Sequence, residues 1–132
     1  MSIPDFPNST PKGVANFQAI LDELLKSEGA TISSTTLEPI SKSNGYQVAL
    51  KGHETNIEAT VESIENYIDN HRLIAENQGA DFGLWLNAES GLIEADICIW
   101  LDEWDAAILR GRSEEQKAIW DWQNMVPIWI EY

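Results

Sequence analysis

The chain has 132 residues, which fits a single domain over 1–132, and 43% of them are hydrophobic, too many for a disordered protein. Only 8 Lys and Arg stand against 22 Asp and Glu, so the net charge at pH 7 is −14. Direct binding to nucleic acid or to an anionic membrane surface needs a basic patch, which this composition disfavours. The charge favours a cationic partner.

The sequence also indicates the cellular compartment in which we expect the protein. Cys98 is the only cysteine, so the chain forms no internal disulfide and fits a reducing compartment. The first residues, MSIPD, lack the basic and apolar regions of a signal peptide. The longest apolar run, 92–101, contains two acidic residues and is shorter than the ~20 residues that a membrane-spanning helix needs. We therefore expect a soluble, cytoplasmic protein that contacts no membrane.

The first half of the chain predicts an irregular segment, a helix, two strands and a second helix. Residues 1–10 are rich in proline and small polar residues. A Thr-Pro start, apolar residues at helical spacing and a glycine stop predict a helix over 11–28. A weak strand is expected at 30–38, and an Asn-Gly turn precedes an alternating strand at 46–50. Isoleucine and valine at helical spacing predict the second helix from Glu54 to at least Asp69.

A β-hairpin within residues 81–102 is the clearest local pattern. Apolar and polar residues alternate on both sides of a turn that contains glycine. In the register that this turn implies, Trp85 pairs with Glu94. Gly83 then pairs with Asp96, and the apolar residues of both strands share one face.

The last part of the chain predicts helices and an edge strand. Residues 104–109 predict a short helix, and a Ser-x-x-Gln capping box predicts a further helix over 113–123. Alternating apolar residues at 126–130 predict a final strand, at a sheet edge because it contains proline. The expected order is α-β-β-α-β-β-α-β. This order predicts an α+β fold with a largely antiparallel sheet of about five strands and helices packed on one face.

Five acidic residues of the second expected helix form an acidic strip. Their spacing places them on one helix face, and no basic residue between Lys51 and Arg72 neutralises them. A solvated helix face usually mixes both signs of charge. The strip is therefore either an acidic surface kept for solubility or a docking surface for a basic partner. Its members are Glu54, Glu58, Glu62, Glu65 and Asp69.

A second acidic region surrounds tryptophans on the outer face of the hairpin. No basic residue occurs between Leu73 and Leu109. Carboxylates around an exposed aromatic side chain are typical of a recognition surface with a central anchor. The alternative is that another element covers the tryptophans and makes them part of the core. The candidate contact residues of this region are Asp81, Trp85, Glu94, Asp96, Trp100 and Asp102.

Signals for catalysis and for metal binding are weak. Glu94 and Asp96 form a candidate acid–base pair, but close pairs arise by chance among 22 carboxylates. His53 and His71 match no metal-ligand spacing, and Cys98 has no second cysteine beside it. The sequence contains no phosphate-binding loop, nucleophile elbow or dinucleotide fingerprint. We expect no metal, no cofactor and no enzymatic activity.

In size, acidity, expected fold and lack of catalytic motifs, the chain resembles the immunity proteins of bacterial toxin systems, including contact-dependent growth inhibition. The resemblance depends on the acidic strip and on the hairpin face with Trp85 and Trp100. It implies an interaction protein that binds a basic cognate toxin domain, often a nuclease, and covers its active site or an adjacent exosite. Direct contact with nucleic acid is not expected.

Two other functions fit parts of the sequence. The acidic strip would extend over about 22 Å of helix. That is roughly one charge per 5 Å, against about 3.4 Å per strand in B-DNA, so a nucleic-acid mimic that inhibits a DNA- or RNA-binding protein is one alternative. A small enzyme that depends on a pair of carboxylates is the other.

Overall fold

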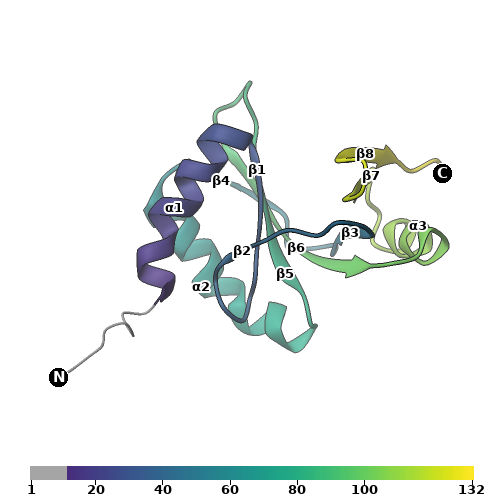
Figure 1. The fold of residues 1–132 in the computed structure, drawn as a ribbon, viewed down its shortest axis with the longest axis horizontal. Coiled ribbons are helices and arrows are strands. Elements are labelled where there is room, and N and C mark those ends of the chain that lie inside the picture. Colours follow the sequence, from purple (N-terminus) through teal and green to yellow (C-terminus); the bar gives the residue numbers. More distant parts are fainter. Residues whose placement is uncertain (1–11) are drawn as a thin grey trace.

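The computed structural model describes residues 12–132, which form three helices and an eight-stranded antiparallel sheet (Figure 1). The predicted irregular segment 1–10 and the Thr-Pro helix start lie outside the described residues. In chain order the elements are α1 (Lys12–Ser27), β1 (Gly29–Ile32), β2 (Pro39–Ile40), β3 (Tyr46–Ala49), β4 (Thr55–Ile57), α2 (Val61–Asn77), β5 (Asp81–Leu86), β6 (Ile93–Leu101), α3 (Trp104–Ser113), β7 (Ala118–Asp121) and β8 (Val126–Trp129).

The strands follow the order β2-β1-β5-β6-β3-β7-β8 across the sheet. The long strand β6 pairs with β5 on one side, and on the other side with β4 near its start and β3 near its end. The predicted hairpin register is confirmed, because Trp85 lies opposite Glu94 and Gly83 lies opposite Asp96. The α+β class and the antiparallel sheet are confirmed as well, with eight strands in place of about five.

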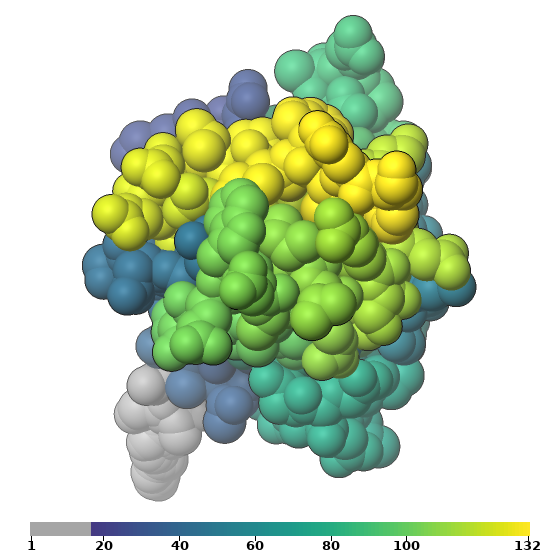
Figure 2. All heavy atoms as spheres, turned by 90° about the vertical axis from the view of Figure 1, so that its right-hand side faces the viewer, coloured from purple at the N-terminus to yellow at the C-terminus, as the bar shows by residue number. Residues whose placement is uncertain are grey.

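All three helices pack on one face of the sheet. Ile20 of α1 and Ile64 of α2 are fully buried in a cluster that includes Phe82 and Ile97 of the sheet. Ile99 lies two residues beyond Ile97 on β6, hence on the same face, and packs against both this cluster and the one beneath α3. Figure 2 shows the α3 side of the molecule, with the C-terminal residues in yellow lying above the helix in this view. Within residues 12–132, none of the helices has the length and apolarity to cross a bilayer.

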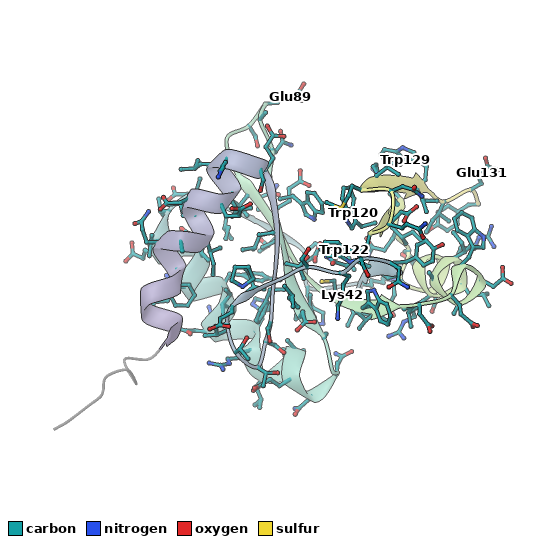
Figure 3. All side chains as sticks on the ribbon, in the orientation of Figure 1. Lys42, Glu89, Trp120, Trp122, Trp129 and Glu131 are labelled. Carbon is teal, nitrogen blue, oxygen red and sulfur yellow. The ribbon has the colours of Figure 1, made fainter. Side chains whose placement is uncertain are left out.

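The other face of the sheet is concave. Strands β5 and β7 are separated by β6 and β3, so in a flat sheet they would lie about 14 Å apart. The ring centroids of Trp85 on β5 and Trp120 on β7 are nevertheless 5.0 Å apart. In Figure 3, Trp120 lies in the space between β1-β5 and β7-β8. The sheet is therefore strongly curled toward the face that carries no helix.

The second helix begins at Val61, so the predicted start at Glu54 is wrong. Residues 55–57 form β4 against β6, and this tertiary pairing overrides the helical spacing of the acidic residues. The Thr60 hydroxyl accepts a hydrogen bond from the Ser63 backbone N–H at 3.1 Å and caps the helix. The helix then continues to Asn77, beyond the minimum end predicted for it.

The predicted helix over 113–123 is also wrong. The preceding helix, predicted only to residue 109, runs on to Ser113, and 118–121 form β7 between β3 and β8. Glu115 has a φ of 58°, a left-handed conformation that interrupts any helix here. In such a short apolar run, periodicity does not separate strand from helix. The final strand is confirmed as β8 at an edge of the sheet, whereas the predicted strand 30–38 is shortened because 33–37 form a turn.

The cap at Thr60 gives a test of the helix start. Thr60→Ala should lower the free energy of unfolding by about 1 kcal/mol, because the Ser63 N–H loses its partner, while Thr60→Ser should retain most of the stability. Urea unfolding followed by circular dichroism measures both variants. If the helix began at Glu54, position 60 would lie in its interior, and Thr60→Ala would stabilise the protein instead.

Candidate functional site

The concave face of the sheet contains a cleft of about 360 Å³ between β5-β6 and β7. Alternation along each strand directs a set of polar and aromatic side chains into it, on the opposite face from the helix-covered core. The side chains that define its chemistry are Gln47, Trp85, Glu94, Asp96, Cys98 and Trp120.

Two tryptophans form the aromatic wall of the cleft. Trp85 and Trp120 are both partly buried, and their rings are inclined by 59°. Trp85 lies against Gly29, where a Cβ would come within 2.7 Å of the ring, so this close approach requires glycine. On the other side of the same two rings, a second hollow of about 530 Å³ extends toward α1 and Trp122. We call it the outer hollow.

Asp96 is the polar residue of the cleft that most needs a ligand. Its Oδ1 is buried and has no hydrogen-bond partner. The carboxylate lies directly over Gly83, whose missing side chain leaves the room for it. Burial raises the pKa of Asp96 to about 7, the charges of Glu54 and Glu94 add to this rise, and a backbone hydrogen bond with Gly83 opposes it. A buried acceptor without a donor is suited to bind a cationic group.

Two further carboxylates lie beside Asp96. Glu94 Oε2 accepts a hydrogen bond from Asn87 Nδ2, and Glu54 Oε2 accepts one from Gln116 Nε2, both at 3.0 Å. Both glutamates line a hollow next to the cleft, also of about 360 Å³, together with Asp96. No Lys or Arg is among the described residues that line the cleft or this hollow, and residues 12–132 contain no cluster of three or more His, Cys, Asp or Glu arranged for a metal ion. The negative charge of the cleft is thus not balanced locally.

The floor of the cleft is held by its own hydrogen bonds. Thr31 Oγ1 donates to Gln47 Oε1 at 2.9 Å, and both residues are buried. The thiol of Cys98 donates to the backbone oxygen of Asp81 at 3.6 Å, and burial raises the pKa of this thiol well above its usual value. Cys98 therefore stays a neutral packing residue rather than a nucleophile.

Only part of the predicted contact set meets here: Trp85, Glu94 and Asp96 line the cleft, and Glu54 lines the hollow beside it. The predicted single helical strip is wrong, because Glu54 and Glu58 precede the helix. The remaining acidic residues of the strip, at 62, 65 and 69, lie on α2, which packs on the opposite face of the sheet. The strip residues therefore do not share one surface.

The other predicted residues have local structural roles or remain at the surface. Asp81 Oδ1 accepts a hydrogen bond from the Ser34 backbone N–H at 3.1 Å. Trp100 donates from Nε1 to the Asn44 backbone oxygen at 2.9 Å, and the Lys42 ammonium lies 5.2 Å from its ring centroid. Asp102 is exposed between β6 and α3. None of the three lines the cleft.

Three of the side chains that define the cleft, Gln47, Cys98 and Trp120, are absent from the predicted contact set. Gln47 lies in a predicted strand without any signal of a site, Cys98 has no second cysteine to suggest a role, and Trp120 lies in the segment wrongly predicted as a helix. Had 118–121 been recognised as a strand, alternation would have placed Ile119 in the core and Trp120 on the opposite face.

Comparisons of the chain with protein-family models, with curated proteins and with solved structures give no match. The chemistry of the cleft is therefore the basis on which a function can be assigned.

The raised pKa of Asp96 makes stability depend on pH. The carboxyl has a pKa of about 7 in the folded protein against 3.8 ordinarily, so the folded state holds its proton more tightly than the unfolded state does. The stabilisation of the folded state that results is complete below the ordinary pKa and is lost as the pH rises through 7. The difference between these two pKa values corresponds to about 4 kcal/mol of unfolding free energy at most. Asp96→Asn should therefore raise the free energy of unfolding at about pH 8 more than at about pH 5, measured by urea unfolding.

Asp69→Asn is the matched control, because this residue is exposed on α2. It removes the same charge and should leave the pH profile of the parent unchanged. Equal profiles for the parent and Asp96→Asn would show that the Asp96 carboxyl is solvated.

Proposed function

We propose that this protein is an acidic interaction protein that binds and neutralises a basic partner, most specifically as the immunity protein of a bacterial toxin acting in the cytosol. The observation that supports this proposal best is the cleft in which two tryptophans lie beside Asp96, whose buried Oδ1 has no hydrogen-bond partner. The net charge of −14 supports it too, since such a charge steers a basic protein toward encounter.

The cleft has the two components of a protein-binding hot spot. Aromatic side chains in a partly desolvated pocket supply contact area, and truncating such an anchor typically costs 2 kcal/mol or more, in rough terms. An anion that is already desolvated gains a strong, charge-assisted hydrogen bond when a cation enters. A basic enzyme that holds a polyanion, such as a nuclease, offers cations of this kind around its active site.

The nucleic-acid mimic has less support. A mimic needs a row of carboxylates that imitates successive phosphates. The five residues of the proposed row are divided between the surroundings of the cleft, a loop and α2, on different sides of the sheet. A general competitor for DNA-binding proteins is therefore disfavoured relative to a partner with one complementary group.

A carboxylate-dependent enzyme is the second candidate, and one observation favours it. Asp96 has a pKa of about 7 and lies beside Glu94 in a cleft, as a general acid or base would at neutral pH. The two functions differ in what they require of Asp96. Turnover needs a carboxyl that exchanges its proton, whereas binding needs a negative charge or a hydrogen-bond acceptor.

Affinity capture followed by reconstitution tests the proposed function. The parent protein should retain a basic protein from a lysate of the source organism, and the purified pair should associate more slowly as salt rises. Glu94→Lys should weaken the reconstituted complex by about tenfold or more, because it places a cation in the cleft. Surface plasmon resonance measures both effects.

Glu89→Lys is the matched control, since it makes the same charge change at the tip of the β5-β6 turn, away from Trp120 (Figure 3). It should slow association only slightly and leave dissociation unchanged. Growth of cells that express the captured protein with or without the parent measures neutralisation. Equal losses of affinity in both variants, or a captured protein that is not inhibited, would contradict the proposal.

A further inference from the structure

The cleft has the chemistry of a receptor for one kind of cationic side chain. We propose that it binds the guanidinium group of an arginine presented by the partner protein, stacked on the Trp85–Trp120 wall and hydrogen-bonded to Asp96. This assignment rests on the proposed function and specifies the group that the partner inserts.

The unpartnered atoms of the protein indicate a ligand that is both cationic and peptidic. Among the described residues, two buried side-chain atoms lack a hydrogen-bond partner: Asp96 Oδ1 and Trp122 Nε1. They belong to hollows on either side of the tryptophan pair, because Asp96 lines the cleft and Trp122 lines the outer hollow. One atom needs a donor and the other needs an acceptor. An arginine within a peptide supplies both, through its guanidinium N–H groups and a backbone carbonyl oxygen.

The walls of the cleft favour arginine over lysine. Besides its carboxylates and the amides of Gln47 and Gln116, the cleft is lined by the two indole rings and by apolar groups such as Ala118 and Pro127. A planar, weakly hydrated guanidinium stacks on indole rings and loses little hydration there. The compact ammonium of lysine is strongly hydrated, so its entry into such walls costs more. The carboxylates of Asp96 and Glu94 also suit the forked donor geometry of arginine.

A titration with short peptides tests the assignment. The probe is the blocked peptide acetyl-Gly-Arg-Gly-amide, and the readout is the set of indole N–H signals in NMR spectra of the intact protein. Saturable shifts are expected for Trp85 and Trp120. The exposed Trp104 and Trp129 lie outside both hollows and serve as internal references.

Matched peptides and variants separate charge from shape. The citrulline peptide, which is nearly isosteric and uncharged, and the lysine peptide should each bind about tenfold more weakly. Asp96→Asn should weaken binding of the arginine peptide by about tenfold, while Asp69→Asn should leave it unchanged. Asp96→Asn keeps the size of the side chain, and its unfolding curve establishes that it is folded.

Several results would overturn the assignment: equal affinity for the citrulline or lysine peptide, normal binding by Asp96→Asn, shifts confined to Trp104 and Trp129, or free arginine binding more tightly than the blocked peptide. Failure of the proposed function looks different. If the protein neutralises its partner but ignores the arginine peptide, only the arginine assignment fails. If it binds the peptide as described but neutralises no basic protein, the arginine assignment holds and the proposed function fails.

Discussion

The contact between Trp85 and Trp120 across the concave face is the interaction on which the cleft depends. It joins two strands that are three positions apart in the sheet, and it can form only because the sheet curls toward the face without helices. Glycine permits the close approach, since Trp85 covers Gly29 and the Asp96 carboxylate covers Gly83. On a flat sheet Asp96 would be one of many solvated surface carboxylates. The curl converts it into a buried acceptor.

One face of the sheet thus stabilises the fold, whereas the other face carries the candidate functional site. The helix-covered face buries a continuous apolar cluster, in which residues such as Ile20, Phe82 and Ile97 are fully excluded from water. The concave face holds what such a core avoids: a buried carboxylate oxygen, Asp96 Oδ1, and a buried indole N–H that both lack a hydrogen-bond partner. Groups of this kind lower the stability of the free protein, and a ligand that supplies their partners recovers the loss on binding. The cleft therefore departs from the rule that buried polar groups are hydrogen-bonded, as expected of a functional site.

The sequence allowed the prediction of features whose determinants are local. Alternation about one turn was sufficient for the hairpin register, and with it for the positions of Trp85, Glu94 and Asp96 on one face. The start of α2 was missed because β4 forms only by pairing with β6, far along the chain. Strand β7 pairs with β3, some seventy residues earlier, and with β8 across the turn at 122–125, but the capping-box pattern and the short apolar run favour a helix there, so the position of Trp120 is not predicted. The residues of the β5-β6 wall are therefore predictable from the sequence, whereas those of the opposite wall are known only from the tertiary structure.

A ¹³C NMR titration of the Asp96 carboxyl measures whether the curled sheet excludes water from this group. The midpoint is expected near pH 7 in the parent protein. In Trp120→Ala, which removes the opposite wall of the cleft, the midpoint should move toward the ordinary value of 3.8. A midpoint near 3.8 in the parent would show that water already reaches the carboxyl and that the curl of the sheet does not bury it.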